Sequence, residues 1–278
     1  MTLMRPWDWK DDWTSTTPVH IGYFWMPHNA GEYRTYSGLA YRDLGLGLAS
    51  SGRMNAHTII VENASSDWQT HDLDFDFVFV LRGSVTVALD GFDDRVLTRR
   101  STILIPRGVR HRIEALEPDI ELVRLTAPAW DVSRKTDELT ESTSHPLEPV
   151  VTDDRSDAYS RGAGPREYFL YRDLETRDVT DGRIHVHIVQ ATAPGPGTGW
   201  HYHTMAQWFF ILDGSAAIQV ESMAKQPLQR GDAMCVGRGE TMRHNVTGFS
   251  EDYTVLEMCV PAEYGTVAVD APEGIRGE

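Results

Sequence analysis

Residues 197–214 read G-T-G-W-H-Y-H-T-M-A-Q-W-F-F-I-L-D-G, and this stretch decides both the fold and the site of the protein. His201 and His203 are separated by one residue. On a β-strand, where side chains alternate between faces, both imidazoles would therefore point to the same side. Gln207 follows directly before an apolar run at 208–212, which has the length of a buried strand. The pattern predicts two consecutive strands with a pair of imidazoles on one face.

A third histidine, His244, comes near the end of the glycine-rich segment 231–245. A turn in that segment would bring the chain back, so that this imidazole meets His201 and His203. Imidazole is a common ligand of Fe, Zn, Cu and Ni, and the three side chains together indicate a metal site. Two strand histidines can also be pocket residues that bond to their neighbours. The ordered addition of Gln207 and His244 favours the metal.

The spacing of these residues resembles the paired motif of the cupin superfamily, G-x5-H-x-H-x3-E-x6-G followed by G-x5-P-x-G-x2-H-x3-N. Gln207 stands where the pattern has Glu, Gly237 stands where it has Pro, and two additional residues precede His244. The residues that match are Gly195, His201, His203, Gln207, Gly214, Gly231, Gly239 and His244. The resemblance implies an all-β fold of the double-stranded β-helix, or jelly-roll, kind, with a divalent metal ion held by His201, His203, Gln207 and His244.

The chain also contains an internal repeat. Residues 41–57 match residues 171–187 without gaps, at an offset of 171 − 41 = 130, and a unit of this length indicates a duplicated domain. Alternating apolar patterns follow both copies, which favours two β-barrels. The predicted organisation is a Trp-rich arm at 1–36, a first cupin domain at 37–128, a linker with room for a short helix at 129–165, a second cupin domain at 166–270 and a tail at 271–278.

The first copy has an altered set of candidate ligands. Counting back from its turn glycine, Gly83, places Asp76 at the position of Gln207, and the remaining positions fall on Gln69, His71 and His111. These residues offer two imidazoles and one carboxylate, enough for a weak metal site or for the remains of one. A gap-free offset of 130 would instead pair His71 with His201; the motif count is preferred because it keeps Asp76 and Gly83 in register.

Two further residues are candidates for catalysis. His187 ends the second copy of the repeat and shares a strand face with His185, so it is expected to face the pocket and move protons. It could equally be a half-buried histidine with ordinary partners. Tyr202, between the two metal-binding histidines, is the second candidate.

The expected ligand set has a chemical consequence. A carboxamide brings no charge, so an ion bound by Gln207 and neutral imidazoles would act as a strong Lewis acid and favour an enolate or phenolate. The resemblance implies an Fe(II)-type dioxygenase, similar to the quercetin-cleaving bicupins. The alternatives are a metal-assisted cyclase or isomerase, similar to cupin polyketide cyclases, and a non-catalytic binding protein. The expected cofactor is Fe, Zn, Ni, Cu or Mn, with Fe or Zn favoured.

Composition limits the partners. The chain has 26 Lys and Arg against 41 Asp and Glu, and a net charge of −15 repels the phosphate backbone of nucleic acids. No segment approaches the ~20 apolar residues of a membrane span, and residues 1–12 lack a signal-peptide pattern. A cytoplasmic protein with a small-molecule substrate is expected. The aromatic residues of the arm need a surface to cover, such as a barrel or a second subunit in a homodimer.

Overall fold

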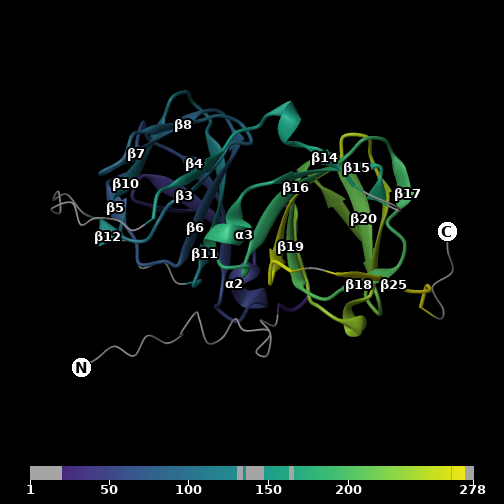
Figure 1. The fold of residues 1–278 in the computed structure, drawn as a ribbon. Helices are drawn as coiled ribbons and strands as arrows, with labels where there is room; N and C mark the ends of the chain where they lie inside the picture. Colours follow the sequence, from purple (N-terminus) through teal and green to yellow (C-terminus); the bar gives the residue numbers. More distant parts are fainter. Residues whose placement is uncertain (1–20, 130–133, 136–146, 163–165, 264, 273–278) are drawn as a thin grey trace. The chain divides into compact units, whose positions relative to one another are not determined.

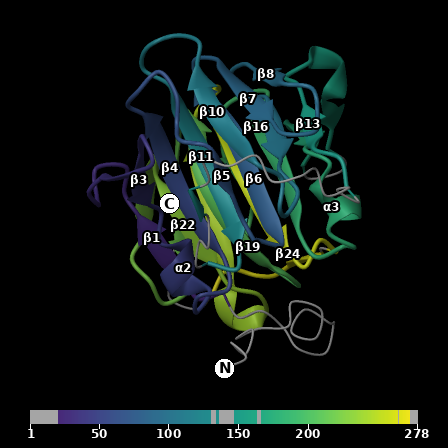
Figure 2. The same cartoon turned by 90° about the vertical axis from the view of Figure 1, so that its left-hand side faces the viewer.

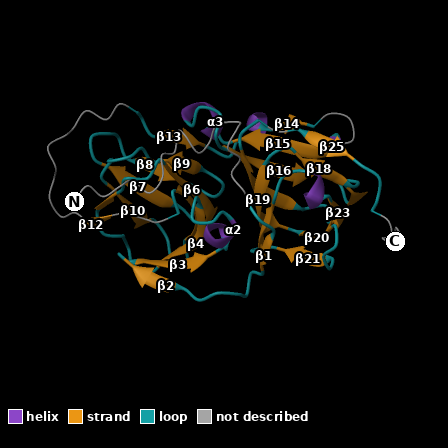
Figure 3. Ribbon diagram, turned by 90° about the horizontal axis from the view of Figure 1, so that it is seen from below, coloured by secondary structure: helices purple, strands orange, loops and turns teal. Residues whose placement is uncertain are grey.

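The computed structural model describes the whole chain except residues 1–20, 130–133, 136–146, 163–165, 264 and 273–278. Strands are the main regular element of the described residues, and the few helices are short (Figure 3). The chain divides into two compact units. The unit formed by Met26–Ser160 is the first barrel. The second barrel is formed by the described residues of Arg161–Glu278 together with residues 21–25 (Figure 1).

The first barrel consists of two antiparallel sheets. Its long central strands lie side by side in Figure 2, where β11 runs between β4 and β6. The larger sheet has the order β13 (Val150–Thr152), β9 (Thr102–Leu104), β6 (Phe75–Arg82), β11 (Glu121–Ala127), β4 (Asn55–Val61), β3 (Leu39–Asp43), β2 (Arg34–Tyr36). The smaller sheet has the order β12 (Arg134–Lys135), β5 (Gln69–Thr70), β10 (His111–Ala115), β7 (Val85–Leu89), β8 (Arg95–Leu97).

The second barrel repeats this plan. Its larger sheet has the order β1 (Phe24–Met26), β22 (Ala233–Val236), β19 (Ala206–Asp213), β24 (Thr254–Val260), β16 (His185–Ala191), β15 (Phe169–Asp173), β14 (Ser160–Arg161). Its smaller sheet has the order β21 (Gln226–Gln229), β20 (Ser215–Val220), β23 (His244–Phe249), β18 (His201–His203), β25 (Thr266–Ala268), and β17 (Gly195–Gly197) also pairs with β23. The fold is all-β, of the jelly-roll kind expected from the sequence.

The sequence repeat is a structural repeat. Strand β3, helix α2 (Leu46–Ala49) and strand β4 recur as β15, helix α3 (Thr176–Val179) and β16 at the offset of 130. In both copies an aspartate shapes the turn before the helix: Asp43 Oδ1 accepts from the Gly45 N–H at 2.7 Å, and Asp173 Oδ1 accepts from the Glu175 N–H at the same distance. The repeated Y-R-D-L sequence thus ends each strand by a side-chain turn.

Apolar alternation builds the core of each barrel. In the second barrel, side chains from both sheets meet, among them Val189 and Ile211 from the larger sheet and Ile218 and Phe249 from the smaller one. The free cysteines Cys235 and Cys259 are both buried, in keeping with their place in apolar strands. Among the described residues, no helix has the length and hydropathy that a membrane span requires.

The edge strands come from outside the repeated units. In the first barrel β13 pairs with β9, and in the second β1 takes the corresponding place beside β22. The expected arm at 1–36 therefore divides: β1 joins the second barrel, where Trp25 packs against the core, and β2 belongs to the first. Residues 1–20 lie outside the described part. The expected linker likewise contributes β13 as well as the short helix η1 (Ser156–Ala158).

Candidate metal centre

Three histidines of the second barrel meet at one point. His201 and His203 are the first and last residues of β18 and are both buried, and His201 pairs in register with His244 at the start of β23. One ligand atom from each of the three residues lies within 4.8 Å of the others. Strand alternation places both β18 imidazoles on one face of the smaller sheet. The pairing of β23 with β18 in that sheet places His244 next to them.

Both departures of the second motif have a local explanation. A Cβ at position 237 would lie 2.6 Å from the Ile21 carbonyl oxygen, so the approach of the N-terminal segment requires the glycine that replaces proline. The two additional residues form part of the short helix η3 (Glu240–Met242), after which the chain enters β23. The loop still closes on the site, because the Gly239 N–H donates to the His203 carbonyl at 2.8 Å.

Each imidazole has one nitrogen fixed by a neighbour. A ring that donates Nδ1–H to an oxygen presents Nε2 as the lone-pair nitrogen, which is how protein neighbours orient metal-binding histidines. The Nδ1 contacts are His201 to the Gly199 carbonyl at 2.8 Å, His244 to the Met242 carbonyl at 2.9 Å, and His203 to Thr266 Oγ1 at 3.2 Å.

The three imidazoles are held neutral. Burial is the main cause for all three. Neighbouring imidazoles add to it for His203, whose pKa is lowered to about 2, and for His244, whose pKa is lowered to about 4. The pKa of His201 is also lowered, by burial and by the charge of Arg166. Metal ligation requires the deprotonated ring, so the site presents its ligands in the binding form at neutral pH.

Gln207 adds an oxygen to this set. It lies buried on β19, and its Nε2 donates a hydrogen bond to the carboxylate of Glu257. Its Oε1 is buried and has no hydrogen-bond partner among the described residues. A buried acceptor without a donor is costly, and a cation beside it would satisfy it. The residues present therefore fit a divalent ion held by three imidazoles and one carboxamide oxygen.

Glu257 is the site residue that the sequence motifs did not identify. It belongs to β24, its side chain is 12% exposed, and its Oε2 lies 3.2 Å from His187 Nε2. Burial alone would raise the pKa of Glu257, but the nearby His187 imidazole and the other charges around it lower the pKa to about 2. The carboxylate is ionised beside the candidate ligands. A comparison of positions 124 and 257, which are equivalent in the two copies, could have drawn attention to it.

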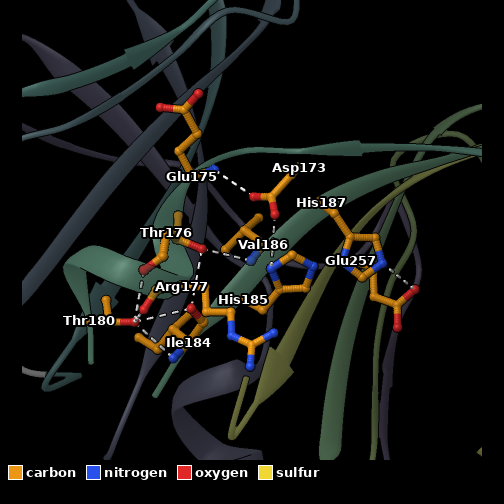
Figure 4. Close-up of polar contacts among 10 residues, drawn as sticks. All are labelled: Asp173, Glu175, Thr176, Arg177, Thr180, Ile184, His185, Val186, His187 and Glu257. Carbon is orange, nitrogen blue, oxygen red and sulfur yellow. Dashed lines mark hydrogen bonds and ion pairs between the residues drawn. The ribbon is translucent and has the colours of Figure 1, made fainter. Parts of the chain in front are cut away.

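The two candidate catalytic residues lie elsewhere than expected. Tyr202 alternates with the histidines on β18, so it faces away from them, and it is not in the wall of the cavity. His187 does not line the cavity either; it lies behind Glu257. Figure 4 shows the arrangement, in which the ring of His185 stands between His187 and Asp173.

The site opens into a cavity of about 500 Å³, including the open solvent at its mouth. Aromatic and aliphatic side chains form most of the wall, and Arg166 contributes its positive charge. Arg166 Nη2 also donates to Thr266 Oγ1 at 2.9 Å. The lining residues are Arg166, Phe169, Tyr171, Val189, Thr198, His201, His203, Gln207, Phe209, His244, Val246, Tyr253, Val255 and Glu257. The mostly apolar wall with one arginine suits a small organic molecule with a negative charge.

The equivalent residues of the first barrel surround a cation from the protein itself. Gln69 pairs with His111 as His201 pairs with His244, which confirms the register given by the motif count. Asp76 Oδ2 lies 3.1 Å from His71 Nε2, and Arg124 donates to both carboxylate oxygens, at 2.7 and 2.8 Å. Gln69, His71, Asp76 and His111 are thus brought together. The guanidinium neutralises the only carboxylate among them, and the described residues of this barrel contain no metal-binding group of three.

The comparisons with known proteins agree with this architecture. A family model described as the cupin domain matches residues 188–259, and no curated protein matches the sequence. An oxalate decarboxylase from Bacillus subtilis, solved at pH 4.6, has a TM-score of 0.62 and 15% identity, covering 90% of this chain and 79% of that one. The formate complex of the Lactobacillus farciminis oxalate decarboxylase has a TM-score of 0.64 and 14% identity, covering 88% of each chain. Residues 188–259 of the second barrel therefore match a cupin domain, and the chain has the two-barrel fold of these oxalate decarboxylases.

Proposed function

We propose that the second barrel is the active centre of a metal-dependent enzyme acting on a small organic anion with a phenolic, enolisable or diketone-like group. One observation carries the proposal: three neutral imidazoles, with ligand atoms within 4.8 Å of one another, meet at the wall of a cavity. Three or four protein ligands would leave coordination positions open for a substrate, as in catalytic rather than structural metal sites.

The residues of the cavity wall indicate what kind of substrate would bind. Arg166 is the only lysine or arginine among the described residues that line it, and it would bind a negatively charged group. Phe169, Phe209 and Val255 would pack against an apolar body and exclude water from it. A divalent ion would supply Lewis-acid chemistry at a substrate oxygen, and iron would in addition permit reaction with O2.

Among reactions on such a substrate, oxygen-dependent cleavage by an Fe(II)-type dioxygenase is our first candidate. Within the described residues, no histidine besides the three candidate ligands lines the cavity. A cyclase or isomerase that depends on a histidine to move protons is therefore less well supported. Glu257, which does line the cavity, is the feature that keeps this non-redox chemistry as the second candidate.

The test is metal analysis of protein purified without added metal, together with O2 uptake and product analysis. The substrates would be phenols, 1,3-diketones and small dicarboxylates, the last because proteins of this fold include oxalate decarboxylases. Iron with O2 uptake would support the dioxygenase, and turnover without O2 uptake would support the non-redox enzyme. Protein that binds no metal and converts none of these substrates would overturn the proposal in favour of a binding protein.

A further inference from the structure

The buried carboxylate of the second barrel stands on a different strand from the one that the cupin pattern assigns to it. The pattern places Glu at position 207, on β19, where this chain has Gln207. Glu257 lies on the adjacent strand β24, opposite Phe209, and so only two residues along from Gln207. The Gln207 amide donates to Glu257 Oε1. The carboxylate of Glu257 is therefore in direct contact with the side chain at position 207, where the cupin pattern has Glu.

The first barrel has the opposite distribution of charge. Arg124 pairs with His57 there as Glu257 pairs with His187 here, so Arg124 and Glu257 are equivalent. In the first barrel the acid, Asp76, keeps the motif position and is neutralised by Arg124 from the neighbouring strand. In the second barrel the acid has moved to the neighbouring strand and meets an amide and an imidazole instead of a guanidinium.

The contacts of Glu257 determine how Gln207 is oriented. One oxygen of Glu257 accepts from Gln207 Nε2 and from Cys259 Sγ, the latter at 3.4 Å. The other lies 3.2 Å from His187 Nε2, the contact drawn in Figure 4. A carboxylate is acceptor-only, so it holds the NH2 end of the amide and directs the carbonyl end away. Gln207 Oε1 is the buried atom that then has no hydrogen-bond partner among the described residues.

We infer that Glu257 is a positioning residue of the metal site: it fixes Gln207 with the carbonyl oxygen free to bind the ion, and it supplies from the next strand the negative charge that the pattern places at 207. His187 anchors the carboxylate from the far side. The inference rests on the metal site of the proposed function and on no particular reaction.

Metal affinity of the protein stripped with a chelator tests this, measured by calorimetric titration with Zn²⁺ and by the visible absorption of added Co²⁺. Residues behind a ligand typically contribute 10–100-fold in metal affinity, so Glu257→Gln should weaken binding by about that factor. Glu251→Gln, at an exposed position, is the matched control and should bind like the wild type. Gln207→Ala removes a proposed ligand and should lose at least as much as Glu257→Gln. The combined Gln207→Ala/Glu257→Gln variant should lose less than the sum of the two, because Glu257 acts in part through Gln207.

The exchange variant Gln207→Glu/Glu257→Gln retains one carboxylate and one amide across the same two strands. It should recover most of the affinity lost in Glu257→Gln. If Glu257→Gln does not fold, the affinity of the exchange variant is compared with that of the wild type instead. Unchanged affinity in Glu257→Gln, additive losses in the combined variant, or an exchange variant that binds no better than Glu257→Gln would each overturn the inference. A wild-type protein that binds neither ion would instead remove the metal site of the proposed function.

Discussion

His203 and His71 occupy the same place in their barrels, but they have different neighbours. The ring of His203 lies beside two other imidazoles, with centroid separations of 4.8 Å to His201 and 5.2 Å to His244. His71 lies 3.1 Å from Asp76, whose carboxylate is bound by Arg124. A guanidinium next to the carboxylate repels a second cation, so the two positions are expected to respond differently to substitution.

The affinity for Zn²⁺ of alanine variants should distinguish His203 from His71. His203→Ala removes one of three imidazole ligands and should lower the affinity for Zn²⁺ at least ~10-fold, an effect comparable with the loss of a supporting residue or larger. His71→Ala should leave the affinity unchanged, because the first barrel offers the ion no free carboxylate. Equal losses from both variants would show that both barrels bind metal.

His111 should make the protein sensitive to mild acid. Burial is the main cause that lowers the pKa of His111, from 6.5 to about 4, although Asp76 opposes it. The unfolded chain binds a proton below pH 6.5 that the folded chain refuses until about pH 4, so stability falls as the pH falls through this window. A lowering of this size corresponds to about 3 kcal/mol.

Urea unfolding at pH 7 and pH 5 should show this loss. His111→Gln should remove the part that His111 contributes, because the substituted side chain does not titrate, whereas the part that comes from the lowered pKa values of His203 and His244 should remain. Parallel pH dependences for the wild type and His111→Gln would contradict the assignment.

The residues of the site were predictable from the sequence where a motif fixed them. His201, His203 and His244 follow from strand alternation and a returning glycine-rich turn. Glu257 does not, because its role depends on which strand lies next to β19, and no local pattern records that neighbour. His187 was placed on the correct strand, but its position behind Glu257 could only be learned from the packed sheet.

At the scale of the elements, the ion pair of Asp76 and Arg124 joins the adjacent strands β6 and β11 inside the first barrel. Arg124→Ala would leave a buried carboxylate without its cation, which typically costs ~3–5 kcal/mol. Replacing both partners by apolar residues, as in Asp76→Leu/Arg124→Met, should recover most of this stability. The free energy of unfolding of the three proteins checks the prediction, and an Arg124→Ala variant as stable as the wild type would disprove it.

The turn after β19 offers a second test at this scale. Gly214 and Gly182 both have φ of 73°, but a Cβ at Gly214 would lie 2.7 Å from the Tyr253 backbone, whereas nothing lies within 4 Å at Gly182. Gly182→Ala should cost only the left-handed backbone term, ~1–2 kcal/mol. Gly214→Ala should add an overpacking cost of ~1–3 kcal/mol. Equal thermal unfolding temperatures for the two variants would show that the turn at Gly214 accommodates a Cβ without an overpacking cost.

The internal repeat predicted the duplicated domain, because both copies retain the same side-chain turn, but it did not predict the short helix in each copy. The strand, short helix and strand of the first copy have the same bounds as those of the second copy once 130 is added to each residue number. The edge strands β1 and β13 were not predicted, since an edge strand needs only three residues and pairs with a partner far away in the chain. Residues 24–26 and 150–152 carry no periodicity long enough to identify them.

For the molecule as a whole, β1 makes the N-terminal segment part of the second barrel. Trp25 and Tyr23 pack against its core, and Ile21 lies against Gly237. Removal of residues 1–36 should therefore lower the thermal stability of the second barrel, whereas removal of residues 1–20 leaves β1 in place and is the matched control. Equal stabilities of the two shortened proteins would count against a structural role for β1.

The same pair of proteins tests the homodimer, which stays a prediction. Sedimentation should give a dimer for the full chain and a monomer without residues 1–36. A dimeric mass for the shortened protein would remove the arm from the subunit interface. The duplicated all-β architecture was predictable from the repeat and the motifs, but the return of the first strand to the last barrel was not, because proximity in space between distant segments leaves no trace in composition.

Because β1 pairs with β22, it cannot complete its pairing until most of the chain has been synthesised. Between Met26 and Ala233 the ribosome must add 233 − 26 = 207 residues, which takes roughly ten to forty seconds at ~5–20 residues per second. The first barrel is synthesised during that interval, while β1 has no strand to pair with because β22 has not yet been translated. A nascent chain stalled before β22 should consequently expose Trp25 to a holdase, and full-length release should bury it.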